Sequence, residues 1–245
     1  MARFAVIMPA AGKSRRFGDK HYKKPFAPLA GRAVWLHAAD KFLGRNDCVQ
    51  LILAVAAEDR EWFDQKFAAN AAILGVDVVE GGAERADSVH NALARVKKDV
   101  DFVAVHDAAR PCIADAWITE VFQAAVRSGA AILAIPVTGT LKRVASGGQI
   151  QETLVRDDLW EAQTPQVFRR AVLEDAYARR GNFPATDDAQ LVERAGTAVT
   201  IVRGSPLNVK ISTRQDLRLA ELALKALPKP RLDGPAHPFA DDRWR

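Results

Sequence analysis

Cysteine and long apolar runs are both scarce in this sequence. Cys48 and Cys112 are the two cysteines in 245 residues, too few for a disulfide framework or a cysteine-based metal cluster. We therefore expect two reduced thiols in a cytoplasmic protein. No apolar stretch approaches the ~20 residues that cross a bilayer, so we expect no membrane association. The apolar segment at residues 4–8, behind Arg3, is also too short for a secretory signal peptide.

Acidic residues are nearly missing from residues 1–32, which carry eight lysines and arginines but only Asp19. This segment therefore has a charge of +7 and the rest of the chain −2, within a net charge of +5. A solvated basic face is one explanation. Nucleic-acid binding is another, although it usually involves a stripe of charge with interleaved aromatic residues. Since the charge lies in one loop between a strand and a helix, we expect a compact polyanion such as a triphosphate, and no nucleic-acid partner.

Apolar runs rich in Val and Ile alternate with amphipathic stretches, in a chain that is 49% hydrophobic and 27% charged. The runs predict strands at residues 4–8, 49–56, 76–79, 102–105, 131–137 and 199–202, and the stretches predict helices at 33–43, 59–69, 87–96 and 115–127. Such alternation predicts an α/β domain over residues 1–227, with a mostly parallel sheet flanked by helices. Ligands of these sheets bind at the carboxyl ends of the strands, so the loops after Met8, Val79, Val105 and Val137 should form one rim.

Two segments depart from this alternation. Residues 141–144 and 150–155, joined through Ser146-Gly147-Gly148, predict a β-hairpin that projects from the sheet. The projecting segment at residues 138–160 is either a plain surface hairpin or a dimerisation arm. Residues 228–245 contain four prolines and predict an extended, poorly ordered tail, so we expect no second domain.

The first rim loop is rich in small and basic residues. It reads Pro-Ala-Ala-Gly-Lys-Ser-Arg-Arg-Phe-Gly at residues 9–18, and small residues let backbone N–H groups approach and cradle phosphate oxygens. Its spacing matches neither the Walker A loop nor the dinucleotide-binding fingerprint. Lys-Pro-Phe-Ala-Pro-Leu-Ala-Gly follows at residues 24–31. Together the segments resemble the nucleotidyltransferase signature, a small-residue loop ending in arginine and then Lys-x-x-x-Pro-Leu-x-Gly before a helix.

Three later motifs narrow the resemblance. They are Gly-Gly-Ala-Glu-Arg-Ala-Asp-Ser-Val at residues 81–89, His-Asp-Ala-Ala-Arg-Pro at 106–111, and Asn-Val-Lys-Ile-Ser at 208–212 with Asp216-Leu217 beyond. With the two N-terminal segments, they are similar to the 2-C-methyl-D-erythritol 4-phosphate cytidylyltransferase family over roughly residues 3–225. The resemblance implies a Rossmann-like nucleotidyltransferase fold. It also implies transfer of a cytidylyl group from CTP to this sugar alcohol phosphate, with release of pyrophosphate.

The resemblance further implies roles for individual residues. Arg16 and Lys24 are catalytic, because positioned cations stabilise the charge that accumulates when a phosphate oxygen attacks the α-phosphorus of CTP. Asp107 binds a divalent metal, Mg²⁺, beside the nucleotide phosphates. The residues that bind the nucleotide are Pro9, Ala10, Ala11, Gly12, Lys13, Gly82, Ala83, Asp87, Ser88 and Ala108. The residues that bind the sugar alcohol phosphate, including two arginines whose planar forks suit phosphate, are Arg110, Thr140, Arg156 and Lys210.

The projecting hairpin holds Thr140 and Arg156. In the family this arm interlocks two subunits, which implies a homodimer whose arm reaches the partner's site. Gly139 stands where the family commonly has an acidic residue, so the start of the arm is expected to be looser. Asp87 and Ser88 also suit the cap of a helix, a role that is compatible with nucleotide binding.

Some alternatives stay open at this point. Lys24 is followed by Pro-Phe where the family commonly has Gln-Tyr, and the neighbouring Lys23 leaves open which lysine is catalytic. His106 is a candidate for a structural hydrogen bond beside Asp107. A ribitol-5-phosphate cytidylyltransferase would share the fold and the chemistry. A non-catalytic nucleotide sensor on the same fold would not need to keep Arg16, Lys24 and Asp107 together.

Overall fold

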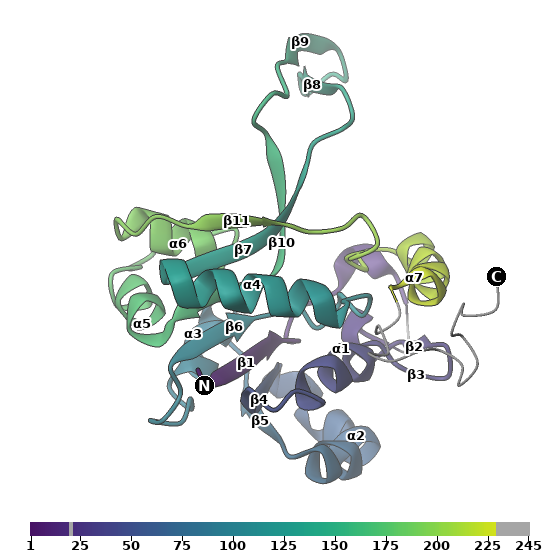
Figure 1. The fold of residues 1–245 in the computed structure, drawn as a ribbon. Coiled ribbons are helices and arrows are strands. Elements are labelled where there is room, and N and C mark those ends of the chain that lie inside the picture. The colour runs from purple at the N-terminus through teal and green to yellow at the C-terminus, as the bar shows by residue number, and fades with distance from the viewer. Residues whose placement is uncertain (20–21, 229–245) are drawn as a thin grey trace, which may run out of the picture.

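The computed structural model describes residues 1–19 and 22–228. Within these residues seven strands form one sheet in the order β11-β7-β10-β6-β1-β4-β5 (Figure 1). The strands are β1 (Phe4–Pro9), β4 (Cys48–Val55), β5 (Val76–Glu80), β6 (Phe102–Val105), β7 (Ala130–Pro136), β10 (Trp160–Arg169) and β11 (Thr200–Arg203). β1 is parallel to β4 and β6, β4 to β5, and β7 to β11. β10 runs antiparallel between β6 and β7.

Helices cover both faces of the sheet. Successive side chains of a strand point to opposite faces, so Val6 and Met8 of β1 enter one apolar cluster while Ala5 and Ile7 enter another. The helices of the first cluster are α1 (Val34–Leu43), α2 (Arg60–Leu74) and α4 (Asp115–Ser128), and those of the second are α3 (Arg85–Leu93), α5 (Arg170–Ala178) and α6 (Asp188–Arg194). The strands need apolar residues on both sides, which explains their Val- and Ile-rich runs.

A third apolar cluster anchors the basic N-terminal loop. Helix α7 (Arg214–Ala226) contributes Ala220 and Ala223 to this cluster, which also buries Phe17 and Leu29. The short elements around them are η1 (Arg15–Phe17), η2 (Lys24–Phe26), β2 (Pro28–Leu29) and β3 (Arg32–Ala33), while η3 (Ala57–Asp59) precedes α2. The loop that carries the candidate catalytic cations is thus packed against the C-terminal helix.

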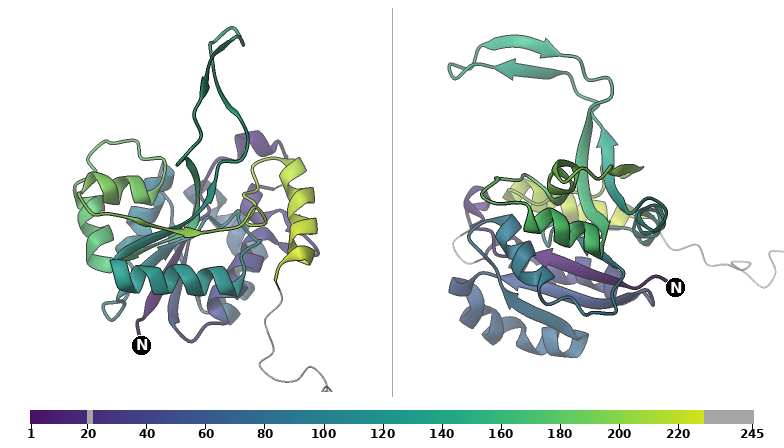
Figure 2. Two further views of the ribbon diagram at one scale, coloured as in Figure 1. Left: turned by 45° about the horizontal axis from the view of Figure 1, so that its top comes forward. Right: turned by 90° about the vertical axis from the view of Figure 1, so that its left-hand side faces the viewer.

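The arm stands clear of this body (Figures 1 and 2). Strands β8 (Leu141–Val144) and β9 (Ile150–Leu154) pair antiparallel in a separate sheet, which confirms the predicted hairpin. The arm leaves at the end of β7 and returns through β10, so both of its roots are strands of the main sheet. Its role in dimerisation stays a prediction. The predicted tail lies outside the described residues from residue 229 onward, and none of the described helices is long and apolar enough to cross a bilayer.

The predicted fold class, a mostly parallel α/β sheet flanked by helices, is confirmed. The pattern does not predict β10, because Gln163, Thr164, Pro165 and Gln166 interrupt its apolar residues and proline rarely occurs within a central strand. The register of β10 against β7 shifts between Ala162 and Gln166, which accommodates these residues. Helices α5, α6 and α7 are likewise absent from the prediction.

Two predicted helices have different limits in the structure. Helix α2 continues past the predicted residue 69 to Leu74 and ends at Gly75, whose φ of 65° is the left-handed conformation that glycine adopts easily. Helix α3 begins at Arg85 rather than at residue 87. Arg85 thereby becomes the first residue of a helix that starts beside the rim.

Candidate active site

A cavity of about 410 Å³ opens at the carboxyl ends of β1, β5 and β6. The residues that line it are Pro9, Ala10, Ala11, Gly12, Lys13, Lys24, Pro25, Gly82, Ala83, Glu84, Arg85, Ser88, Asp107, Ala109 and Lys210. We call it the nucleotide cavity. The predicted rim is confirmed for the loops after these three strands. The described residues of the loop after β7 lead into the arm and do not line the cavity.

Ser14 joins the two N-terminal segments of the cavity wall. Its backbone is left-handed, with a φ of 50°, and its hydroxyl accepts a hydrogen bond of 3.1 Å from the backbone N–H of Lys24. The same hydroxyl donates to the carbonyl oxygen of Gly12 at 3.3 Å. Ser14 therefore fixes the lysine relative to the small-residue loop. The sequence carries no signal for this role, because a left-handed turn is usually marked by glycine or asparagine.

The second wall, residues 81–88, approaches the first very closely. A Cβ atom on Gly81 would lie 2.3 Å from the Cβ of Ala11, so only glycine fits there. The hydroxyl of Ser88 accepts from the backbone N–H of Gly82 (3.0 Å) and donates to the carbonyl oxygen of Glu84 (3.2 Å). Ser88 thus braces this loop from within.

Two predicted nucleotide-binding residues do not line the nucleotide cavity. Asp87 accepts from the backbone N–H of Glu84 (3.0 Å) and forms an ion pair with Arg180. It therefore caps the N-terminus of α3. Ala108 is fully buried, and its neighbour Ala109 lines the cavity instead. The capping role considered for Asp87 is therefore the one that the structure describes.

The two neighbouring lysines have different surroundings. Lys24 lies on the cavity wall, where burial lowers its pKa and the charges of Lys210 and Arg16 lower it further, against an opposing effect of Asp107. Lys23 points instead to the start of α2, and its Nζ lies 2.6 Å from Asp59 Oδ2. The geometry favours Lys24 as the lysine that meets the substrate.

Arg16 and Lys13 complete the basic side of the cavity. Lys13 is exposed and lines the wall. Arg16 is exposed and lies just beyond the lining residues, yet close enough for its charge to affect the pKa of Lys24. Both side chains are free to move toward a polyanion, as long basic side chains at a rim commonly do.

Asp107 lies at the floor of the cavity, where β6 has ended. Its Oδ2 lies 2.6 Å from Lys210 Nζ and 3.7 Å from Arg110 Nε, and its Oδ1 lies 3.1 Å from Arg85 Nε. Burial alone would raise the pKa of Asp107, but the charges of Arg85, Lys210 and Arg110 hold the pKa well below its usual range. The carboxylate is therefore ionised at neutral pH.

Arg85 is a site residue for which the motif at residues 81–89 predicts no role. Its guanidinium spans two carboxylates, with Nε against Asp107 and Nη1 2.8 Å from Oδ2 of the fully buried Asp188. Burial disfavours its charge, but Asp188 and Asp107 outweigh this effect and raise the pKa of Arg85. Asp188 lies 103 positions farther along the chain than Arg85, as their numbers give, so no local pattern could have indicated the contact.

Buried hydrogen bonds tie Asp107 and Lys210 to the sheet. The backbone N–H of Asp107 donates to Thr164 Oγ1 on β10 (3.0 Å). Arg110 Nη1 donates to the carbonyl oxygen of Asn208 (2.7 Å), which holds the segment that carries Lys210. His106 is fully buried between Arg110 and Thr164, and burial lowers its pKa to about 4. His106 has the structural hydrogen bonds considered above.

A second cavity, of about 220 Å³, shares Arg85, Asp107 and Lys210 with the nucleotide cavity. The residues that line it are Arg85, Asp107, Arg110, Ala162, Gln163, Thr164, Gln166, Thr186, Asp187 and Lys210. We call it the acceptor cavity. It unites Arg110 and Lys210, two of the predicted phosphate-binding residues. Thr140 and Arg156 lie on the arm and line neither cavity, and Arg156 donates to the carbonyl oxygen of Thr138.

The predicted metal site can be tested by its donor set. The described residues contain no cluster of three or more His, Cys, Asp or Glu side chains that could hold a metal. Mg²⁺, however, commonly binds through one or two carboxylates together with substrate phosphates and water. Asp107 offers one such oxygen, Oδ2, whose partner Lys210 is partly exposed. The residues present fit a Mg²⁺ ion that is shared with a triphosphate.

A basic cavity at the carboxyl edge of an α/β sheet, joined to a second cavity through Arg85, Asp107 and Lys210, suits a nucleotidyltransferase. The family model described as "2-C-methyl-D-erythritol 4-phosphate cytidylyltransferase" matches residues 4–226. The protein of that name from Rhodopirellula baltica is 44% identical over 234 residues, which cover 91% of this chain and 95% of the relative. The chain belongs to the 2-C-methyl-D-erythritol 4-phosphate cytidylyltransferase family.

Solved structures agree with this assignment. The crystal structure of 2-C-methyl-D-erythritol 4-phosphate cytidylyltransferase from Thermus thermophilus is 34% identical, with a TM-score of 0.74 over 92% of this chain and 100% of that chain. The structure of the Francisella tularensis protein of the same name is 29% identical, with a TM-score of 0.76 over 91% of this chain and 100% of that chain. The chain is thus an enzyme of cytidylyl transfer in isoprenoid biosynthesis.

Proposed function

We propose that the two cavities hold the two substrates of cytidylyl transfer. CTP occupies the nucleotide cavity, and 2-C-methyl-D-erythritol 4-phosphate places its phosphate in the acceptor cavity. The observation that carries this proposal is that both cavities are lined by Arg85, Asp107 and Lys210. A phosphate in one cavity and a triphosphate in the other would therefore meet at these three side chains.

The reaction requires two anions to approach each other. A phosphate oxygen of the sugar alcohol forms a bond to the α-phosphorus of CTP, the bond from this phosphorus to the bridging oxygen breaks, and pyrophosphate leaves with the electron pair. Lys24 and Arg16 stabilise the charge that accumulates at the α-phosphate, because cations that are already in place require no reorganisation during the reaction. Lys210 and Arg110 hold the attacking phosphate.

A divalent ion fits the same site. Asp107 and the phosphates of the nucleotide would hold Mg²⁺, which would supply further neutralisation of the negative charge. With the ion bound, Lys210 would be available to the acceptor phosphate, and Arg85 would hold the other oxygen of Asp107.

Recognition of the base rests on the loop after β5. Backbone groups of Gly82 and Ala83 face the nucleotide cavity, and Ser88 keeps their loop in one shape through its two hydrogen bonds. Cytosine and uracil differ at the exocyclic group and the adjacent ring nitrogen. A rigid backbone edge therefore rejects uracil by leaving a buried hydrogen-bonding group unpaired.

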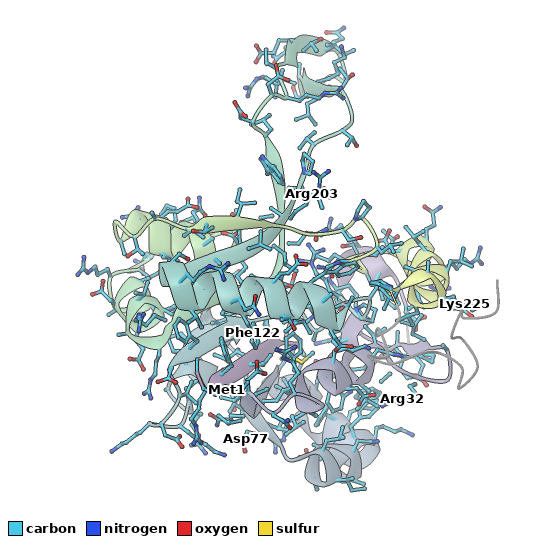
Figure 3. The ribbon with its side chains drawn as sticks, in the orientation of Figure 1. Met1, Arg32, Asp77, Phe122, Arg203 and Lys225 are labelled. Carbon is cyan, nitrogen blue, oxygen red and sulfur yellow. The ribbon has the colours of Figure 1, made fainter. Side chains whose placement is uncertain are left out.

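We also propose a homodimer joined through the arm. Figure 3 shows the side chains of the arm standing clear of the body, and its apolar residues Val144, Ile150 and Val155 are 50–76% exposed. Apolar side chains gathered on a protruding hairpin typically mark an interface. A partner subunit would cover them, and its arm would bring Thr140 and Arg156 to the acceptor cavity.

The enzyme is proposed to act in the cytoplasm. Cys48 and Cys112 are both free, and burial raises the pKa of their thiols to about 11 and about 12. Both are therefore unreactive thiols that need no oxidising compartment.

Pyrophosphate release tests the proposed substrates. With CTP and Mg²⁺, 2-C-methyl-D-erythritol 4-phosphate should support turnover and ribitol 5-phosphate should not. UTP in place of CTP should lower kcat/KM by roughly 5- to 150-fold, since an unpaired buried group costs about 1–3 kcal/mol. Faster turnover with ribitol 5-phosphate would contradict the proposed acceptor, and equal use of UTP would contradict the proposed base recognition.

A further inference from the structure

Arg85 contacts two carboxylates that belong to different parts of the protein. Asp107 lines both cavities, as Arg85 itself does, whereas Asp188 is fully buried at the start of α6 and lines neither. Arg85 Nε lies 3.1 Å from Asp107 Oδ1, and Arg85 Nη1 lies 2.8 Å from Asp188 Oδ2. The planar fork of arginine can face two acceptors at fixed angles, which a lysine cannot do.

The two oxygens of Asp107 have partners of different mobility. The near partner of Oδ2 is Lys210 at 2.6 Å, whose ammonium sits on a flexible stem and whose side chain is 41% exposed, while the buried Arg110 lies farther away at 3.7 Å. Oδ1 faces Arg85, whose side chain is 26% exposed and whose guanidinium is also bound to Asp188. Oδ2 is therefore the oxygen that can exchange partners when substrate arrives, while Oδ1 keeps the carboxylate plane in place.

Besides Arg85, two uncharged side chains hold Asp188: Tyr177 and Gln166. Its Oδ1 accepts from the hydroxyl of Tyr177 (2.6 Å), and its backbone N–H donates to Gln166 Oε1 on β10 (3.1 Å). Burying a carboxylate is costly unless it is paired and hydrogen-bonded. Among the described residues, Arg85 is the cation that pairs with it. The contacts of Asp188 thus all hold it where it can bind Arg85.

We propose that Arg85 is a positioning residue for Asp107 and that Asp188, held by Tyr177, positions Arg85. The chain of contacts runs from the α5–α6 region, through the first residue of α3, to the carboxylate shared by both cavities. This positioning role rests on the proposed role of Asp107 in the reaction. A plain structural role, in which these residues only join α3 to α5 and α6, is the alternative that an experiment must separate.

A double-mutant cycle separates the two roles. The variants are Arg85→Gln, Asp188→Asn and their combination, each measured for kcat, for the equilibrium Kd of CTP and for Tm. Loss of an outer-shell partner typically costs about 10–100-fold in activity, so each single variant should lower kcat within this range and leave the Kd of CTP within about threefold. If Asp188 acts through Arg85, the double variant should match Arg85→Gln within about twofold, the usual error of additivity.

Two further variants provide controls. Tyr177→Phe removes one hydroxyl while it keeps the ring stacked on His90, so it should lower kcat in the same direction by a smaller factor even if Asp188→Asn fails to fold. Asp47→Asn breaks a comparable half-buried pair, Arg45 Nη2–Asp47 Oδ2 at 2.7 Å, which lies outside both cavities. This variant should lower Tm and keep kcat within about twofold of the wild type.

The outcomes are distinguishable. Losses of kcat that multiply in the double variant, or Tm losses with unchanged kcat per folded molecule, would overturn the positioning role. A tenfold weaker Kd of CTP at unchanged kcat would make Arg85 a binding residue and would also overturn it. Asp107→Asn is measured in parallel. If it keeps full activity, the proposed function of Asp107 fails, whereas an inactive Asp107→Asn beside fully active Arg85 and Asp188 variants would refute only the present inference.

Discussion

Replacing Lys24 with methionine should mainly lower activity, whereas replacing Lys23 with methionine should mainly lower stability. Methionine keeps the length of the aliphatic stem and removes only the charge. Lys24 lies on the wall of the nucleotide cavity, whereas Lys23 forms ion pairs with the two acidic residues at the start of α2, Glu58 and Asp59. The two variants therefore have nearly the same composition but lose different contacts.

The expected magnitudes follow from these surroundings. Lys24→Met should lower kcat by roughly 10²–10³-fold, the usual effect of removing one preorganised charge stabiliser. The lowered pKa of Lys24 means that its charge disfavours folding at any pH below that pKa. Lys24→Met should therefore keep or raise Tm.

Lys23→Met should lower Tm and change kcat little. Its pair with Asp59 lies near the surface, where such pairs contribute about 0.2–1 kcal/mol. For a protein of this size, 1 kcal/mol corresponds to about 2–4 °C, so Tm should fall by at most about 4 °C while kcat changes less than about tenfold. Pyrophosphate release at saturating substrates gives kcat, and a thermal melt without ligands gives Tm. A greater loss of kcat in Lys23→Met than in Lys24→Met would refute the choice of Lys24.

Three other perturbations have defined outcomes. Gly81→Ala places a methyl group against Ala11 and should raise the KM for CTP, visible in initial rates, whereas an unchanged KM would mean that the two loops separate freely. Because the pKa of Lys24 is lowered, the fall of kcat at alkaline pH should lie below pH ~10.4, the ordinary pKa of lysine. This fall should move to higher pH in Lys24→Arg, and an unmoved profile would assign it to another group. Co-expressed, doubly tagged heterodimers of Arg156→Ala and Lys24→Met should regain up to half the wild-type activity, because one site receives both defects and the other neither, whereas inactive heterodimers would show that the arm serves its own subunit.

The parallel half of the sheet was predictable because its strands are buried on both faces. Val- and Ile-rich runs of this kind can be recognised as strands without knowing which strands lie beside them. The order of the loops at the carboxyl edge then follows from the parallel topology. β10 differs because Gln166 and Thr164 bond to groups far along the chain, Asp187 and the backbone of Asp107. Their polar character makes sense only once those partners are in place, so local sequence cannot identify the strand.

The residues of the candidate site also fall into those that the local sequence indicates and those that it does not. Residues in compact motifs, such as Lys24 and Asp107, could be assigned from the sequence together with the family resemblance. Ser14 and Asp188 could not, because one acts through a backbone conformation and the other through a partner in a distant helix. The arm residue Arg156 was assigned by resemblance, and within one subunit it stays outside both cavities.

The place of β10 in the sheet also constrains the order of assembly during synthesis. The strands β1, β4, β5 and β6 pair with one another, whereas both neighbours of β7, β10 and β11, come later in the chain. Translation proceeds at about 5–20 residues per second. The four-stranded part can therefore form before the arm, β10 and β11 have been synthesised, and until then β7 has no strand to pair with. Asp107 belongs to the early part, and Thr164 and Lys210 belong to the late part. Neither cavity has its full wall until the late part has joined, because Lys210 lines both, so the two substrates can be held together only after the sheet is complete.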